Sequence, residues 1–277
     1  MHGWVDSSRQ AIEFTMDPRN FLHAERVLQF KSLSYDGSAT VEGIERILRG
    51  TDFYRRIVEF RNSEGQHIQT DRTYAELLYE AGRTSRVNPY HLASRMRIEV
   101  GPHLLHPSIS GIVPGYEGLF NFYNIGATSE PIFMDVIRNG LRFARRTEGR
   151  GINNEELLIP WNTKERAMTG GAIFIGSRYI NVGQNTIYLQ KFDVNPERGY
   201  PLFWHQYMTS LLAPGSEARI LYNAYRDIGL LDEAIHLIIP VFENMPEIKV
   251  ESPNIDPEDF KEDSGVMRVI SVRKSKC

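Results

Sequence analysis

The stretch "NPYHLASRMRIEVGP" (residues 88–102) carries the clearest helix signal in the chain. Asn88 is a favourable N-cap, and Pro89 suits the first turn because an N–H at that position would have no helical partner. The Gly-Pro pair that closes the stretch predicts the end of the helix. Glu99 therefore falls in the last turn.

The position of Glu99 favours an uncharged carboxyl group. It lies three residues after Met96 and seven after Leu92, so it shares the apolar stripe expected to face the interior. Burial disfavours the ionised form, and so does the negative end of the helix dipole. A general acid must be protonated before it acts. The alternative is a solvated helix end where Glu99 pairs with Arg95 or Arg97, and the helix alone does not decide between them.

Composition limits the classes of protein that need to be considered. The 277 residues are 41% hydrophobic and 24% charged, as in an ordinary globular protein, and the length suits one main domain with appendages. A net charge of -3 gives no reason to expect a nucleic-acid partner. The single cysteine, Cys277, excludes an intrachain disulfide. No metal site and no cofactor are expected.

Neither an export signal nor membrane insertion is expected from this sequence. The N-terminal residues contain no basic segment followed by an apolar run. A membrane-spanning helix needs about 18 or more apolar residues in succession, and the chain has no such run.

Further helices are predicted from the spacing of apolar residues and from capping patterns. Thr73 and Glu76 form a capping-box pattern that predicts a helix start. Other helices are expected in residues 20–30, 41–48, 131–146, 161–180 (opened by Asn162) and 215–231 (capped by Ser216). Residues 101–130 are predicted to be irregular or β-containing, residues 183–194 to form a strand or extended loop, and residues 266–277 to contain one strand.

Two adjacent glycines, Gly170 and Gly171, fall inside one of these predicted helices. Each costs about 1 kcal/mol of helix stability relative to alanine. Close backbone packing or the approach of a ligand is expected to compensate.

A second carboxyl group, Glu117, follows Glu99 by eighteen residues, in "PGYEG". Aromatic residues surround it. Two carboxyl groups facing each other across a cleft lined with flat rings is the arrangement that glycoside hydrolysis needs. The alternatives are that Glu117 is a turn residue without a role, and that Phe120 and Phe122 belong to an ordinary core.

Four blocks follow one another in the chain: "HLASRMRIEVG", "SGIVPGYEGLFNFYNIGA", "PWNTKERAMTGGAIFIGSRYINVGQNTIYLQKFDV" and "HQYMTSLLAP". In this order they resemble the endo-β-N-acetylglucosaminidase modules of bacterial autolysins, family seventy-three of the glycoside hydrolases. The resemblance runs from about residue 17 to about residue 225. It departs from the family pattern at Ile98, where a polar residue is expected.

The resemblance implies a lysozyme-like α+β fold, predominantly α, in which a helical lobe and a small β lobe flank a substrate groove. Residues 71–248 are expected to form the catalytic core. Residues 1–70 would be an N-terminal helical region packed on this core, and residues 249–277 an acidic linker and C-terminal tail.

The resemblance also implies an activity, cleavage of the peptidoglycan glycan strand after N-acetylglucosamine. Glu99 falls at the position of the family's general acid, and Glu117 falls where some members carry a second carboxylate. A positioned water or the acetamido group of the substrate are the alternatives to Glu117. Tyr188 matches a groove tyrosine near the cleaved bond, with a buried structural role as the alternative. The residues expected to contact the substrate are Tyr116, Asn124, Gln184, Gln206 and Tyr207.

The resemblance places the chain at the cell wall or outside the cell, with peptidoglycan glycan strands as its partner. It is expected to be a monomeric module, part of a longer cell-wall protein. Two other functions stay open: a muramidase or lytic transglycosylase on the same scaffold, and a glycan-binding module without catalysis. The sequence does not fix the stereochemical course of the reaction.

Overall fold

The computed structural model describes residues 7–127, 136–146, 153–208 and 210–252, and the backbone of residues 269–276. The chain divides into two compact units. One consists of residues 34–181, and the other joins residues 1–33 to residues 182–277. Within the described residues, no helix has the length and hydrophobicity to cross a membrane.

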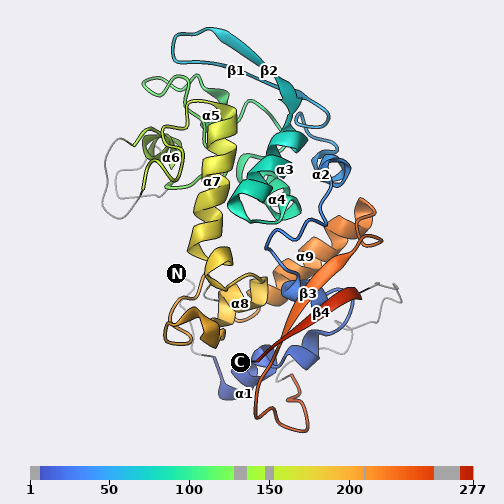
Figure 1. The fold of residues 1–277 in the computed structure, drawn as a ribbon. Coiled ribbons are helices and arrows are strands. Elements are labelled where there is room, and N and C mark those ends of the chain that lie inside the picture. The colour runs from blue at the N-terminus through green and yellow to red at the C-terminus, as the bar shows by residue number, and fades with distance from the viewer. Residues whose placement is uncertain (1–6, 128–135, 147–152, 209, 253–268, 277) are drawn as a thin grey trace. The chain divides into compact units, whose positions relative to one another are not determined.

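The unit of residues 34–181 is a group of helices with one β-hairpin (Figure 1). Helix α3 packs against α2, α4 and α7, and strands β1 and β2 pair antiparallel. The elements are α2 (Val41–Leu48), β1 (Ile57–Arg61), β2 (His67–Thr73), α3 (Tyr74–Ser85), α4 (Pro89–Val100), α5 (Pro107–Ser110), α6 (Val136–Arg145) and α7 (Lys164–Arg178). A short 3-10 helix, η3 (Ile180–Val182), follows α7 in the sequence.

The helix ends around α3 and α4 agree with the sequence prediction. Thr73 and Glu76 form the capping box that opens α3. The side chain of Asn88 accepts two backbone N–H groups at the start of α4. Gly101 ends α4 with a φ of 69°, a backbone conformation that glycine adopts at little cost. These caps place Glu99 in the last turn of α4, as predicted.

Several sequence predictions were wrong. The β1–β2 hairpin was not predicted and begins within the segment expected to be helical. Of the two alternatives expected for residues 101–130, the described part is irregular, with turns and α5 and no strand. Residues 187–192 form helix α8, not a strand, because Thr186 caps the N–H of Leu189. Helix α7 is capped by Thr163 instead of Asn162, and α9 begins at Ala213, so that Ser216 lies inside it.

An aromatic core fills the unit of residues 34–181. Phe53, Tyr74, Phe120 and Phe122 are fully or almost fully buried. The ring centres of Phe53 and Tyr74 lie 5.1 Å apart, in an edge-to-face arrangement. The alternative considered for Phe120 and Phe122, an ordinary core position, is therefore what the structure shows.

The charged side chain of Lys164 is buried against this core. Its ammonium group donates a hydrogen bond to the hydroxyl of Tyr74 (2.8 Å) and lies near the ring faces of Tyr74 and Phe120. Burial lowers the pKa of Lys164 to about 8, and burial also raises the pKa of Tyr74. The bond joins the first residue of α7 to the first residue of α3.

Gly170 and Gly171 pack as closely as expected. A Cβ atom on Gly170 would lie 2.1 Å from the carbonyl oxygen of Leu157, and one on Gly171 would lie 2.4 Å from the ring of Tyr123. Both distances are shorter than real contacts of a Cβ atom, so only glycine fits without movement of the neighbours.

The second unit is built from the two ends of the chain. Strands β3 and β4 pair in parallel, and the 3-10 helix η2 packs against α8 and α9. The strand predicted near the C-terminus is confirmed as β4, whereas its partner β3 was not predicted. The elements are α1 (Arg9–Met16), η1 (Pro18–Phe21), η2 (Val27–Phe30), α8 (Ile187–Phe192), η4 (Pro196–Arg198), α9 (Ala213–Asp227), β3 (Ile235–Val241) and β4 (Val269–Lys276).

We expect Gly170→Ala to lower the free energy of unfolding by about 1 to 3 kcal/mol, because overpacking outweighs the gain in helix propensity. Urea unfolding followed by circular dichroism measures the change. Ser177→Ala, at an exposed position of the same helix, is the matched control and should be neutral or slightly stabilising. A Gly170→Ala variant as stable as the wild type would show that Leu157 can move aside.

The buried Lys164 is expected to make the free energy of unfolding depend on pH. Because folding lowers its pKa from 10.5 to about 8, the unfolded chain binds more protons than the folded chain between these values. The free energy of unfolding should therefore rise with pH in this window, by about 2 kcal/mol from pH 8 to pH 10. Urea unfolding of the wild type and of Lys164→Met across this range tests it, since the variant should lack the rise. Parallel pH profiles would contradict the prediction.

Candidate active site

Glu99 is held at the end of α4 by two neighbours. One carboxyl oxygen lies 3.4 Å from Nε of Arg95, one turn back on the same helix. The amide of Asn124 donates a hydrogen bond to the backbone carbonyl of Glu99 (2.7 Å) and approaches the other carboxyl oxygen at 3.4 Å. The side chain of Glu99 remains 24% exposed.

These distances show how firmly the carboxyl group is held. A charge-assisted hydrogen bond usually measures about 2.7 to 2.9 Å, and both contacts to the Glu99 carboxyl oxygens are longer. The side chain is therefore oriented and still accessible. Of the two arginines considered from the sequence, Arg95 is the partner, whereas Arg97 donates to the carbonyl of Ile47.

Asn124 reaches this position through an unusual backbone conformation. Its φ is 48°, in the left-handed region, which asparagine tolerates better than most residues. The carbonyl of Glu99 belongs to the last turn of α4, where carbonyls lack helical partners. The Asn124 side-chain amide supplies the missing donor for this carbonyl. The predicted groove residue Asn124 is thus brought directly to Glu99.

Glu117 and Tyr116 lie in an exposed turn of the same unit. The N–H of Gly115 donates to the Glu117 carboxylate (3.1 Å), and backbone N–H groups of Glu117 itself and of Gly115 lower the pKa of Glu117. Arg145 of α6 donates to the carbonyl of Gly115 and lies over the Tyr116 ring, 4.6 Å from its centre. No hydrogen bond joins Glu117 to Glu99 among the residues that the structure describes.

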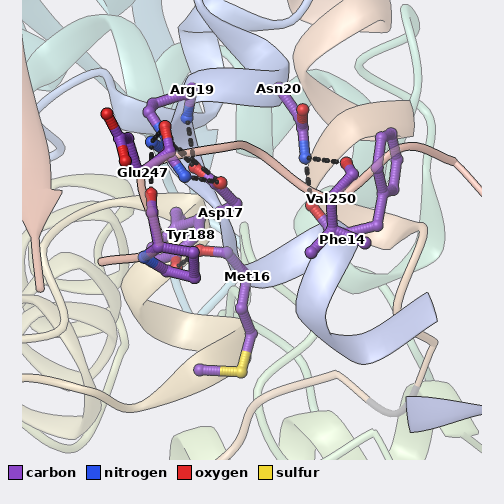
Figure 2. Close-up of polar contacts among 9 residues, drawn as sticks. Phe14, Met16, Asp17, Arg19, Asn20, Tyr188, Glu247 and Val250 are labelled. Atoms are coloured by element: carbon purple, nitrogen blue, oxygen red, sulfur yellow. Dashed lines mark hydrogen bonds and ion pairs between the residues drawn. The ribbon is translucent and has the colours of Figure 1, made fainter. Parts of the chain in front are cut away.

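Tyr188 and Gln184, in the other unit, are fully buried. The hydroxyl of Tyr188 donates to the carbonyl of Met16 (Figure 2). The amide of Gln184 donates to the carbonyls of Leu189 and His205. Their contacts are those of structural residues, and the groove role expected for each stays a prediction.

Gln206 and Tyr207 are exposed in the same unit. Both lie in the segment between η4 and α9. The N–H of Tyr207 donates to the carbonyl of Gln190 (2.8 Å), and the amide oxygen of Gln206 accepts from Lys191 (3.3 Å). Their side chains are at the surface, where a ligand can contact them.

The residues at the start of the resemblance have a structural role. Arg19 pairs with Asp17 (2.6 Å) and donates to the carbonyl of Pro246 (2.8 Å). The amide of Asn20 donates to the carbonyls of Phe14 and Val250, as Figure 2 shows. These contacts fasten residues 246–250 to the N-terminal segment.

Two features close to the predicted site residues were not predicted from the sequence. One is Arg145, which connects α6 to the turn that carries Tyr116 and Glu117. The other is the pair Phe203 and Trp204, which is exposed directly before His205. The adjacent Phe and Trp before the matched block "HQYM" was the available signal for the second, but large apolar residues usually predict a core.

Loss of the Asn124 amide should destabilise the end of α4. We expect Asn124→Gly, which tolerates the left-handed backbone, to lower the free energy of unfolding by about 1 to 3 kcal/mol, because the Glu99 carbonyl loses its donor. A double-mutant cycle with Glu99→Gln, followed by urea unfolding, separates the backbone bond from the side-chain contact. We expect a coupling below about 0.5 kcal/mol, because the shorter bond is to the backbone. A larger coupling would show that the side-chain contact dominates.

Comparison with known proteins gives bifunctional autolysins among the relatives of this chain. No family model matches the chain. A bifunctional autolysin of Staphylococcus aureus (strain MSSA476) is 22% identical over 229 residues, which cover 82% of this chain and 16% of the relative. The relative from strain MRSA252 gives the same identity and coverage. The chain therefore spans about a sixth of the length of these curated relatives.

Two solved structures share the fold. The crystal structure of S. aureus glucosaminidase B superposes with a TM-score of 0.60 at 22% identity, covering 82% of this chain and 76% of that one. The crystal structure of a major bifunctional autolysin gives a TM-score of 0.57 at 21% identity, covering 82% and 80%. The chain has the α+β fold of these two proteins, and the resemblance to autolysin glucosaminidases stated from its sequence is confirmed.

Proposed function

We propose that this chain hydrolyses the glycan strands of peptidoglycan as an endo-β-N-acetylglucosaminidase, with Glu99 as the general acid. The observation that carries the proposal is the setting of Glu99. Its carboxyl group is oriented by Arg95 and Asn124, accessible, and placed at the end of α4 in a fold that glucosaminidase B shares. A general acid needs orientation toward the leaving oxygen and access to it.

Glu117 is proposed as the second carboxyl group. It is exposed, and backbone N–H groups lower its pKa, so it stays ionised at neutral pH. An ionised carboxylate suits a base or a stabiliser of an oxocarbenium-like centre, whereas an acid must hold its proton. Water positioned by other groups, or the acetamido group of the substrate, would serve if Glu117 is a turn residue only.

Gln206 and Tyr207 are proposed to contact the glycan. An amide and a phenol can both bond to sugar hydroxyl and acetamido groups, and a phenol ring can stack on a sugar face. Tyr116 is proposed to act similarly from its exposed turn, where Arg145 fixes its ring. Tyr188 and Gln184 are proposed to act indirectly, by positioning the segments to which they donate hydrogen bonds.

The proposed setting is the bacterial cell wall. The curated relatives are named autolysins and are much longer than this chain, which supports a role as one module of a cell-wall protein. Peptidoglycan is then the partner, and we propose that the module works as a monomer.

Replacement of the proposed acid tests the function directly. Glu99→Gln should reduce turnover of purified peptidoglycan by roughly 10²- to 10⁴-fold, the usual contribution of general acid catalysis, and should keep the wild-type circular dichroism spectrum. Glu80→Gln, on α3 of the same unit, removes an exposed carboxylate that pairs with Arg83 and serves as the matched control. Full turnover in Glu99→Gln would remove Glu99 from the mechanism.

The glycan ends produced in the same digestions distinguish a glucosaminidase from a muramidase, a lytic transglycosylase and a binding module. Reducing N-acetylglucosamine ends support the proposal. Reducing muramic acid ends would identify a muramidase, and anhydromuramic ends a lytic transglycosylase. Binding to peptidoglycan without any new ends would identify a binding module.

A further inference from the structure

The loop of residues 199–208, "GYPLFWHQYM", exposes an unusual number of aromatic side chains. Trp204 is 82% exposed, Tyr200 65%, Phe203 51% and Tyr207 42%. Trp161, in contrast, is fully buried in the other unit. Exposed apolar surface is unfavourable by about 25 cal/mol per Å², so a concentration of large exposed rings on one loop indicates a binding surface.

The backbone of this aromatic loop is fixed at alternate residues. The N–H of Phe203 donates to the carbonyl of Asp193 (3.0 Å), and the N–H of His205 donates to the Asp193 carboxylate (2.7 Å). The N–H of Tyr207 donates to the carbonyl of Gln190 (2.8 Å). All three acceptors lie in α8 or directly after it, so the loop follows this helix closely.

Asp193, which receives two of these bonds, is itself deeply buried. It forms an ion pair with Arg198, whose side chain is also buried. A buried carboxylate is strongly unfavourable unless it is paired and hydrogen-bonded. The N–H of His205 and the guanidinium of Arg198 contact this carboxylate, so the loop conformation contributes to the stability of the unit.

Two further buried side chains, those of Gln184 and Lys191, form hydrogen bonds with the loop. Gln184 bonds His205 twice, through the backbone carbonyl (2.7 Å) and through the ring Nδ1 (2.7 Å). Lys191 donates to Gln206 (3.3 Å) and to the carbonyl of Met208 (3.0 Å). The rings are thus exposed on a backbone that buried polar groups keep in one conformation.

The chemistry of the loop defines the class of ligand. It contains no Asp, Glu, Lys or Arg, so it does not select for a charged partner. Flat rings with a few polar groups suit the apolar faces and hydroxyl groups of pyranose rings. A fixed backbone also reduces the ordering cost of binding. A neutral saccharide chain fits these properties best.

We infer that the aromatic loop is a glycan-stacking surface on which Trp204, together with Phe203 and Tyr200 of the same loop, holds saccharide units of the strand. The inference rests on the proposed function for the identity of the glycan. It extends the contact beyond Gln206 and Tyr207, which lie in the same loop and are proposed to touch the substrate. The aromatic loop then contributes affinity for long chains and takes no part in bond cleavage.

Binding to chitohexaose tests the inference in the full chain. Isothermal titration is carried out on the Glu99→Gln variant, to prevent turnover, and on the same variant with Trp204→Ala, Trp204→Tyr or Ile220→Ala. We expect Trp204→Ala to weaken binding by roughly five- to tenfold, and Trp204→Tyr to recover most of the loss because a ring is kept. Ile220→Ala, at an exposed apolar position of α9, should bind like its parent.

A spectroscopic readout is independent of catalysis. With Trp4→Phe, emission comes from buried Trp161 and exposed Trp204, and chitohexaose should shift and change the emission of Trp204. Unchanged affinity in Trp204→Ala, or emission that does not respond, would overturn the inference. Self-association of the chain that Trp204→Ala abolishes, with glycan affinity unchanged, would also overturn it and assign the surface to a second copy.

These outcomes separate the inference from the proposed function. If the wild type produces no new glycan ends and Trp204 still responds to chitohexaose, the aromatic loop binds glycan and the hydrolase assignment falls. If the wild type cleaves peptidoglycan and Trp204→Ala binds chitohexaose normally, only the inference falls.

Discussion

The end of α4 depends on one carbonyl oxygen that the helix cannot satisfy. The last turn of any α-helix leaves carbonyls without N–H partners. Here the carbonyl of Glu99 accepts a hydrogen bond from the side-chain amide of Asn124. This bond ties the Gly-rich segment after α4 to the helix end. It also brings the same amide beside the Glu99 carboxyl group. The Asn124 side chain therefore meets a structural requirement of the helix and also contributes, with Arg95, to the orientation of the proposed acid.

The parts of the fold that local signals specify could be predicted. The caps of α3 and α4 follow from rules that act within a few residues. The helix-propensity cost of Gly170 and Gly171 is also local and predicted close packing, but not the partners Leu157 and Tyr123. The β1–β2 hairpin and the parallel pairing of β3 with β4 were not predicted. The pairing of β3 with β4 depends on contacts between segments about thirty residues apart. The strands β1 and β2 are close in the sequence, but their burial does not alternate, so no period-two pattern marked them. Residues 187–192 alternate like a strand, but the cap at Thr186 and burial of Tyr188 favour a helix.

The candidate site was predictable to a similar degree. Helix register and the resemblance placed Glu99, and the structure supplies its neighbours Arg95 and Asn124. The sequence could not show that Gln184 is buried, because its neighbours in the sequence do not distinguish a buried glutamine from an exposed one. It also could not show that Phe203 and Trp204 are exposed. Their exposure depends on buried Asp193 and Arg198, an arrangement that only the folded chain creates.

The unit formed by the two ends of the chain has a consequence for the order of folding. Residues 34–181 form their unit from one continuous segment, so it can fold as soon as that segment has left the ribosome. The other unit cannot be completed then, because Arg19 and Asn20 bind residues 246 and 250. During synthesis, more than two hundred further residues must be added before the partners of Arg19 and Asn20 have been made. A chaperone that protects this segment would act on the slower unit and leave the one that carries Glu99 unaffected.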